Sequence, residues 1–241
     1  MTNHRILLVL GNSVSLPPAE APAHNPVRSY PELLHEFLQP RGWRIEKRIV
    51  SGATVEDIER TASVTLPQLG ADAIVIQLGI VDCAPRPLRE SEREIVGRIR
   101  PAMLRNLIIS IIHRYRAELI DRRGLIQRTP IEPFRQSFHR LVEQCLLATQ
   151  HVAVLPILPA TAANRARNRR VEAEIAKYNE AMRKEPHITM PEVEVLFRGI
   201  SIETLCITQE SVHLNQRGHD LIARFLEGWL RPLTPDAGEP E

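Results

Sequence analysis

The stretch Arg5-Ile6-Leu7-Leu8-Val9-Leu10-Gly11-Asn12-Ser13-Val14-Ser15, near the N-terminus, decides the fold class of this chain. An apolar run of strand formers that ends in glycine and small polar residues is typical of a central parallel strand. The carboxyl end of such a strand opens onto the ligand site of an α/β protein. There a serine hydroxyl is exposed, and backbone N–H groups can stabilise a developing oxyanion. On this stretch alone, Ser13 and Ser15 are better interpreted as residues that cap a turn or helix.

A histidine near the other end of the chain changes that interpretation. Glu210 precedes His213 by three residues, so its carboxylate can orient the imidazole from the same loop. The imidazole can then take a proton from a serine that the fold brings close. Because Ser13 and His213 lie near opposite ends of the sequence, only tertiary structure can join them.

Two turns that contain glycine lie between these residues, each after an apolar segment. Ser51-Gly52-Ala53-Thr54 is the first, and its glycine permits close approach of the backbone to a ligand. Leu78-Gly79-Ile80-Val81-Asp82 is the second, and it follows the clearest buried strand of the sequence, 71–78. Considered alone, Gly52 would be interpreted as a simple passage from strand to helix.

Taken in order, these four stretches resemble the sequence blocks of the SGNH (GDSL-like) hydrolase superfamily. The resemblance spans nearly the whole chain, and the order and spacing of the short motifs carry its specificity. It implies that Ser13 is the nucleophile, His213 the base and Glu210 the acid of a catalytic triad. It also implies that Gly52 contributes to an oxyanion hole.

The sequence departs from the family pattern at three positions. Asn12 and Glu210 each replace an aspartate, and both changes are chemically mild. Val81 stands where the family has an asparagine that donates to the oxyanion, and valine has no side-chain donor. Loss of such a donor typically costs about 2.7–4 kcal/mol. Either another group fills the position, or the enzyme is slow, or the protein is not a hydrolase. The backbone N–H groups of Ser13 and Gly52 remain as donors.

Residues that follow Val81 are further candidates for the site. Asp82 either orients a neighbouring group or forms an Asx-type turn or helix cap. Arg86, held between two prolines, either binds an anionic substrate group or pairs within its loop. Cys83 is expected to be a small buried packing residue. The predicted set for oxyanion and substrate binding is Gly52, Asn12, Val81, Asp82 and Arg86.

The alternation of apolar strands and amphipathic helices predicts a three-layer α/β/α sandwich with a parallel central sheet, as in flavodoxin-like folds. We expect one domain over 1–231 and a disordered, Pro- and acid-rich tail over 232–241. Smaller expectations are a loop over the site entrance at 16–25, a surface loop at 161–170 and a short strand around 193–197. His219 is expected near the surface of the last helix.

A helical insertion is expected around 89–128, where apolar residues recur at helical spacing between arginines. Three interpretations of it stay open. It packs on the core with a solvated basic face, or its 104–119 helix makes a homo-oligomer contact, or it attracts an anionic glycan, carrier or membrane surface.

The composition indicates the cellular compartment of the protein and excludes some classes of binding partner. The net charge of +2 implies no polyelectrolyte partner, and no nucleic-acid-binding motif is present. The odd set of three cysteines suits a reducing compartment, and no zinc-ligand spacing or membrane-spanning stretch occurs. We therefore expect a cytoplasmic protein that requires neither a metal nor an organic cofactor.

The resemblance implies an esterase that forms an acyl-enzyme on serine. Its expected substrate is a small ester or acylated glycan, and the arginines at 165–170 favour an anionic one. Two alternatives stay open. One is an acyltransferase that passes the same acyl group to an alcohol or amine. The other is a non-catalytic ligand-binding protein on a degenerate scaffold, for which Val81 is the best evidence.

Overall fold

Parallel strands form the centre of the structure, a computed structural model that describes residues 4–234. Within these residues the sheet has four strands in the order β2-β1-β3-β4. They are β1 (Arg5–Gly11), β2 (Trp43–Ile49), β3 (Ala73–Gln77) and β4 (Val152–Leu155). Every neighbouring pair is parallel, so all the carboxyl ends lie at one edge. The predicted parallel sheet is confirmed.

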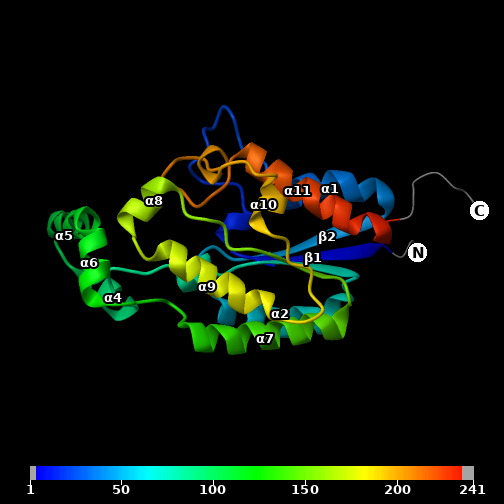
Figure 1. Cartoon of the computed structure of the whole chain (residues 1–241), viewed down its shortest axis with the longest axis horizontal. Coiled ribbons are helices and arrows are strands. Elements are labelled where there is room, and N and C mark those ends of the chain that lie inside the picture. Colours follow the sequence, from blue (N-terminus) through cyan, green and yellow to red (C-terminus); the bar gives the residue numbers. More distant parts are fainter. Residues whose placement is uncertain (1–3, 235–241) are drawn as a thin grey trace, which may run out of the picture.

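Helices cover both faces of this sheet (Figure 1). Leu8 and Leu10 contribute to one hydrophobic core and Leu7 and Val9 to the other, because successive side chains of a strand alternate. The helices on the first face are α2 (Val55–Leu69), α7 (Ile131–Ala148) and α9 (Val171–Arg183). Those on the second face are α1 (Tyr30–Leu38), α10 (Val193–Phe197) and α11 (Gln216–Leu230). The three-layer sandwich predicted from the alternation of elements is confirmed.

Local sequence sets where several helices begin. Ser29 and Glu32 form the predicted capping box of α1, in which the Ser29 N–H donates to Glu32 Oε2 at 2.7 Å. Thr54 caps α2 in the same way with Asp57. Asn215 caps α11, as predicted, by accepting a hydrogen bond from the N–H three residues on.

Two segments differ from their predicted conformation. Residues 193–197 form helix α10 rather than a strand, because the helical conformation buries the Leu196 and Phe197 side chains in the core. The sheet gains only an isolated parallel bridge, between Thr189 and Ala153. The surface loop expected at 161–170 contains a short helix, α8 (Ala162–Arg167).

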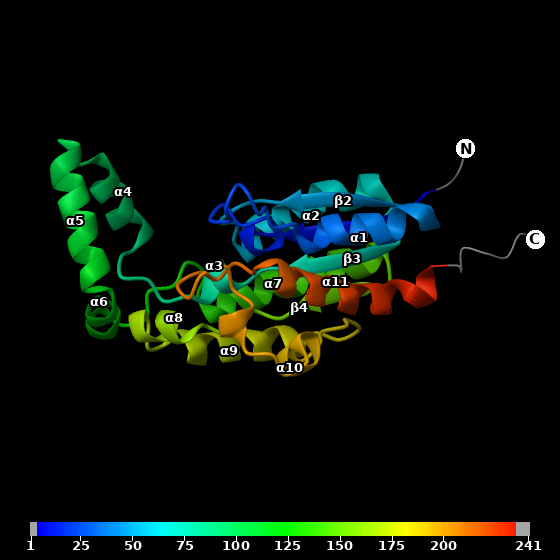
Figure 2. The ribbon, with the colours of Figure 1, turned by 90° about the horizontal axis from the view of Figure 1, so that it is seen from above.

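The helical insertion is present, but its first two helices do not pack on the core. It consists of α4 (Glu90–Arg98), α5 (Ala102–Arg114) and α6 (Arg116–Arg123). Helices α4 and α5 extend away from the sheet, as Figure 2 shows. No residue of α5 is buried, and Met103 is 82% exposed, whereas Ile120 of α6 is buried. The expectation of a packed insertion is therefore wrong for α5. The oligomer contact predicted over 104–119 stays a prediction.

Short elements complete the described chain. They are α3 (Ile80–Cys83) and the 3-10 turns η1 (Ser13–Ser15), η2 (Gln39–Arg41), η3 (Ile202–Thr204) and η4 (Arg231–Leu233). The last turn includes residues that we assigned to the tail, and 235–241 lie outside the described residues. None of the helices described over 4–234 has the length and apolar character needed to cross a membrane.

His219 of α11 is buried, so its expected surface position is wrong. Its Nδ1 accepts a hydrogen bond from the Tyr30 N–H at 3.3 Å, and the two rings lie side by side. Burial lowers the pKa of His219 to about 4. The imidazole is therefore neutral in the folded protein at neutral pH.

Acid is expected to destabilise the fold through His219. Between about pH 6.5 and pH 4 the unfolded imidazole binds a proton and the folded one does not, so this contribution is full above pH 6.5 and falls as the pH drops. The loss amounts to about 2–3 kcal/mol at pH 4.5. Urea unfolding at pH 7 and pH 4.5 should show the stability advantage of the wild type over His219→Gln shrinking by about that amount. Burial also raises the pKa of Asp82, so that carboxyl group adds its own pH dependence to the stability. Asp82 is present in both proteins, so its contribution cancels in the comparison. A difference that is the same at both pH values would contradict the prediction.

Candidate active site

Ser13 and His213 come together at the carboxyl edge of the sheet. Ser13 begins the turn η1 directly after β1, and His213 lies in the loop before α11. The distance between Ser13 Oγ and His213 Nε2 is 3.2 Å, within hydrogen-bond reach. Both side chains are partly exposed, so a ligand can reach them. This is the geometry of a nucleophile beside its base.

A buried network fixes the turn that carries Ser13. Ser15 Oγ donates to Gln77 Oε1 at 2.7 Å and accepts from the Tyr30 hydroxyl at 3.1 Å. Gly11 leaves room for this network, because a Cβ at Gly11 would lie 2.6 Å from Ser15 Oγ. Ser15, which we considered only as a cap, thus ties the turn to β3 and α1.

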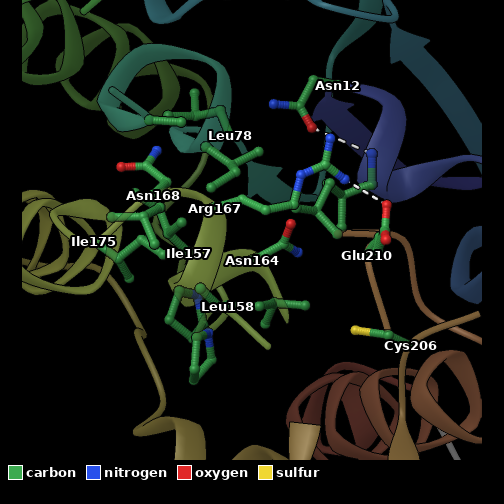
Figure 3. Close-up of a pocket in the computed structure, with 18 of the residues that line it drawn as sticks. Asn12, Leu78, Ile157, Leu158, Asn164, Arg167, Asn168, Ile175, Cys206 and Glu210 are labelled. Carbon is green, nitrogen blue, oxygen red and sulfur yellow. Dashed lines mark hydrogen bonds and ion pairs between the residues drawn. The ribbon is translucent and has the colours of Figure 1, made fainter. Parts of the chain in front are cut away.

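Glu210 does not hydrogen-bond His213 in this structure, which corrects the expected pairing. Its carboxylate pairs with the guanidinium of Arg167 in α8 instead (Figure 3). The group at His213 Nδ1 is the carboxylate of Glu20, with Oε1 at 3.3 Å. A guanidinium is always charged and binds a carboxylate through charge-assisted hydrogen bonds, so Arg167 is a strong partner for Glu210.

Glu20 is the functional candidate that sequence reasoning missed. It lies in the Pro-rich segment 16–25, which we expected to cover the site entrance. Its spacing from Ser13 matches no block of the family, and its distance in sequence from His213 gives no local signal. The position of that loop directly after the nucleophile turn was the one available indication.

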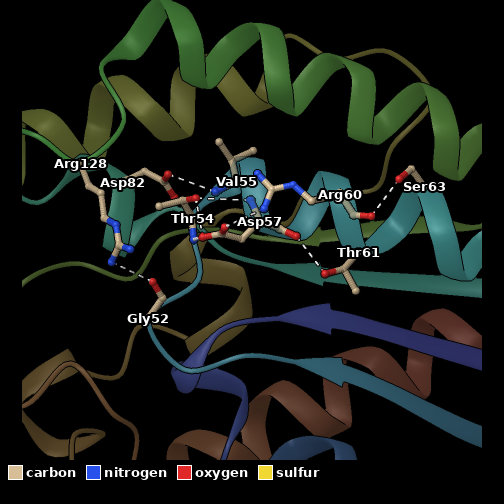
Figure 4. A network of polar contacts seen from close by, with 9 residues as sticks. All are labelled: Gly52, Thr54, Val55, Asp57, Arg60, Thr61, Ser63, Asp82 and Arg128. Carbon is tan, nitrogen blue, oxygen red and sulfur yellow. Dashed lines mark hydrogen bonds and ion pairs between the residues drawn. The ribbon is translucent and has the colours of Figure 1, made fainter.

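The backbone donors that the resemblance assigned to an oxyanion hole are free. The Val50 N–H donates to Gly11 O at 3.0 Å, which sets the turn after β2 beside the turn of Ser13. Gly52 has φ of 72°, in the left-handed region that favours glycine. Its carbonyl accepts from Arg128 at 3.2 Å (Figure 4). Among the hydrogen bonds of residues 4–234, neither the Ser13 N–H nor the Gly52 N–H has a protein acceptor.

The contacts of the predicted residues after β3 are with other parts of the protein. The Val81 side chain has no hydrogen-bond donor, and its backbone carbonyl accepts a hydrogen bond from the Arg86 guanidinium at 3.1 Å. Asp82 is buried and accepts from the Val55 N–H at 3.1 Å, so it caps α2 (Figure 4). Burial raises the pKa of Asp82 to about 6. Arg86 also lies 3.7 Å from Glu90. In the structure Asp82 therefore acts as a helix cap and Arg86 forms an ion pair, which were the two structural interpretations of these residues.

A cavity of about 270 Å³ adjoins the pair of Ser13 and His213. Asn12, Val14 and Val212, the chain neighbours of the two residues, line it. Its walls are mainly apolar: Leu78, Ile80, Ile157, Leu158, Val171 and Ile175. Charged and polar side chains complete the lining: Asn164, Asn168, Arg167 and Glu210, which Figure 3 labels, and Arg116. The volume is at the lower end for small-molecule sites, about 300 Å³, which suits a small substituent of a substrate.

Thiols and metal ligands are not gathered at this site. All three cysteines are buried and free, and burial raises the pKa of Cys206, which lines the cavity, to about 11. In the part of the chain that the structure describes, no group of three or more His, Cys, Asp or Glu side chains is placed to hold a metal ion.

Comparisons with known proteins agree with this fold. No protein-family model matches the chain, and no curated protein matches it in sequence. Solved structures do match. A lipase/acylhydrolase from Enterococcus faecalis superposes with a TM-score of 0.66 at 11% identity, covering 98% of this chain and 100% of its own.

Two further structures match over a similar extent. A variant of Axe2, an acetyl xylan esterase from Geobacillus stearothermophilus, has a TM-score of 0.59 at 14% identity, covering 95% of each chain. TesA has a TM-score of 0.59 at 15% identity, covering 95% of this chain and 99% of its own. The resemblance seen in the motifs is thus confirmed at the level of the fold: over nearly its whole length this chain has the fold of the SGNH/GDSL-type hydrolases.

Proposed function

We propose that this protein is a serine ester hydrolase. The observation that carries the proposal is the 3.2 Å separation of Ser13 Oγ and His213 Nε2, at the carboxyl edge of the sheet and beside a cavity. The fold shared with lipases and esterases supports the reaction class by analogy. The free N–H groups of Ser13 and Gly52 support it chemically, because acyl transfer needs donors for a developing oxyanion.

In the proposed reaction Ser13 Oγ attacks the ester carbonyl carbon as its proton passes to His213 Nε2. The oxygen of the tetrahedral intermediate lies at the N–H groups of Ser13 and Gly52. Collapse breaks the bond to the alcohol, which takes the proton from His213, and leaves an acyl group on Ser13. Water then attacks the acyl-enzyme as His213 takes its proton, and the carboxylic acid leaves while Ser13 regains its hydrogen.

Glu20 has a positioning role in this mechanism. In this role the Nδ1–H of His213 donates a hydrogen bond to Glu20 Oε1, which leaves Nε2 free to accept from the Ser13 hydroxyl. The carboxylate also stabilises the imidazolium formed when the proton arrives. Because the Glu20 side chain is 46% exposed, water screens this charge and the effect is weaker than that of a buried carboxylate.

The proposal is tested by labelling with a serine-directed fluorophosphonate, read by intact mass. We expect a single adduct on the wild type and none on Ser13→Ala, because the probe reacts with an activated serine hydroxyl. Ser63→Ala is the matched control, and it should keep the adduct because Ser63 is exposed on α2 and its hydroxyl donates only to the Arg60 carbonyl. Absence of an adduct on well-folded wild type would overturn the proposal in favour of a binding protein.

A further inference from the structure

A second cavity adjoins the first and shares part of its wall. It lies between the helices α4 and α5 and the loop after α3, with a volume of about 620 Å³. Ala84 and Arg116 line both cavities. Arg116 begins α6, where the insertion returns to the body of the protein, so the projecting helices place a guanidinium at the junction.

Four arginines line the two cavities, and among the described residues Arg116 alone of these four has no acidic partner. The other three are paired: Arg86 and Arg93 with Glu90, and Arg167 with Glu210. Within the described residues no carboxylate lies within ion-pair distance of Arg116. Burial, followed by the positive charge of Arg167, lowers the pKa of Arg116. The junction therefore holds a partly desolvated positive charge that the protein does not neutralise.

We propose that Arg116 binds a carboxylate of the substrate, so that the preferred substrate is an ester whose cavity-bound substituent ends in a carboxylate. This inference rests on the proposed function and names its substrate class. A guanidinium binds a carboxylate with two parallel hydrogen bonds, which gives both energy and orientation. One unpaired guanidinium carries one charge, which matches a monoanion better than a phosphate dianion.

The lining of the first cavity indicates the chemical character of the rest of the bound substituent. Asn12 and Val14 flank the nucleophile at one side of the cavity, and Arg116 is part of the same lining. Much of the remaining lining is apolar, with Leu78, Ile157 and others. An ester carbonyl at Ser13, an apolar spacer and a terminal carboxylate match these three kinds of surface.

The test uses two pairs of esters, each made of an anion and its neutral isostere. In the first pair the carboxylate is on the acyl side. Its members are p-nitrophenyl hemiglutarate and p-nitrophenyl 5-methylhexanoate, in which two methyl groups replace the carboxylate oxygens. In the second it is on the alcohol side: the acetates of p-hydroxybenzoate and of p-isopropylphenol. We measure kcat/KM on wild type, Arg116→Gln and Arg114→Gln. Arg114 is the matched control, because it is exposed two residues earlier and lines neither cavity.

We expect wild type and Arg114→Gln to prefer the anionic ester of at least one pair by about tenfold or more, as charge-assisted hydrogen bonds allow. Arg116→Gln should lose that preference, because its kcat/KM should fall about tenfold more for the anionic ester than for the neutral one. No preference in either pair, or a preference that survives Arg116→Gln, would overturn the proposal. Hydrolysis of the neutral esters in that case would leave the proposed function standing.

A binding measurement keeps the two proposals separable when no ester is hydrolysed. Calorimetric titration of the same four esters into Ser13→Ala, with and without Arg116→Gln, reports affinity without turnover. A preference for an anionic ester that Arg116→Gln removes supports the carboxylate site even if the hydrolase proposal fails. Equal affinity for the anionic and neutral members of both pairs contradicts it.

Discussion

Replacing His213 with alanine is expected to lower kcat for ester hydrolysis by on the order of 10⁶-fold. His213 Nε2 is the group that hydrogen-bonds Ser13 Oγ at 3.2 Å, so its loss leaves the hydroxyl without a base. The leaving alcohol also loses its acid, because one imidazole serves both steps. The fall should appear in kcat more than in KM, since the imidazole acts mainly in the transition state. Steady-state hydrolysis of p-nitrophenyl acetate measures it.

His213→Ala should retain some activity over the uncatalysed reaction. The backbone donors of Ser13 and Gly52 are unchanged, and such donors with binding sustain about 10³–10⁴-fold acceleration in enzymes that lack triad members. The His139→Ala variant is a control for general effects of removing an imidazole, because His139 lies on the exposed side of α7. A His213→Ala protein that keeps a tenth of the wild-type kcat would show that another group is the base.

The second large effect is expected at Glu20. A buried carboxylate in this role contributes about 10⁴-fold to kcat. The Glu20 carboxylate is 46% exposed and 3.3 Å from His213 Nδ1, so we expect Glu20→Gln to lower kcat by roughly 10²-fold. Because the interaction is partly screened charge, raising the salt concentration should lower the wild-type kcat more than that of Glu20→Gln. Kinetics at low and high ionic strength measure both effects.

Glu210→Gln decides between the two acids. In the structure Glu210 pairs with Arg167, so its replacement should leave kcat within a few-fold and act mainly on KM through the cavity lining. A larger fall in kcat for Glu210→Gln than for Glu20→Gln would contradict the structural assignment. It would restore the assignment made from sequence spacing.

Local patterns in the sequence were sufficient for much of the fold. The unbroken apolar run of β1 can be buried on both faces only at the centre of a parallel sheet, and the structure places it there. Caps such as Ser29 and Asn215 begin their helices through hydrogen bonds that span three residues. The caps depend on interactions between residues close in sequence, and the burial of β1 follows from its own apolar composition, so a local pattern can express both.

Predictions failed where distant contacts decide the conformation. Residues 193–197 include two valines and a phenylalanine, which favour strands, yet they form a helix because Leu196 and Phe197 pack into the core beneath it. The apolar spacing of α5 predicts a buried face, but the helix projects from the body and exposes Met103 and Leu107. The spacing shows that a helix has an apolar side and does not show what that side contacts.

The same distinction between local patterns and distant contacts applies to the candidate site. The sequence by itself determined the candidate positions Ser13, Gly52 and His213, since each lies in a short motif tied to the end of a predicted element. Only the tertiary structure decided that Ser13 meets His213, that Arg167 takes Glu210, and that Glu20 reaches the imidazole. The physical reason is that a carboxylate pairs with the nearest favourable charge in space. Spacing along the chain limits that choice within one loop but not between loops that folding brings together.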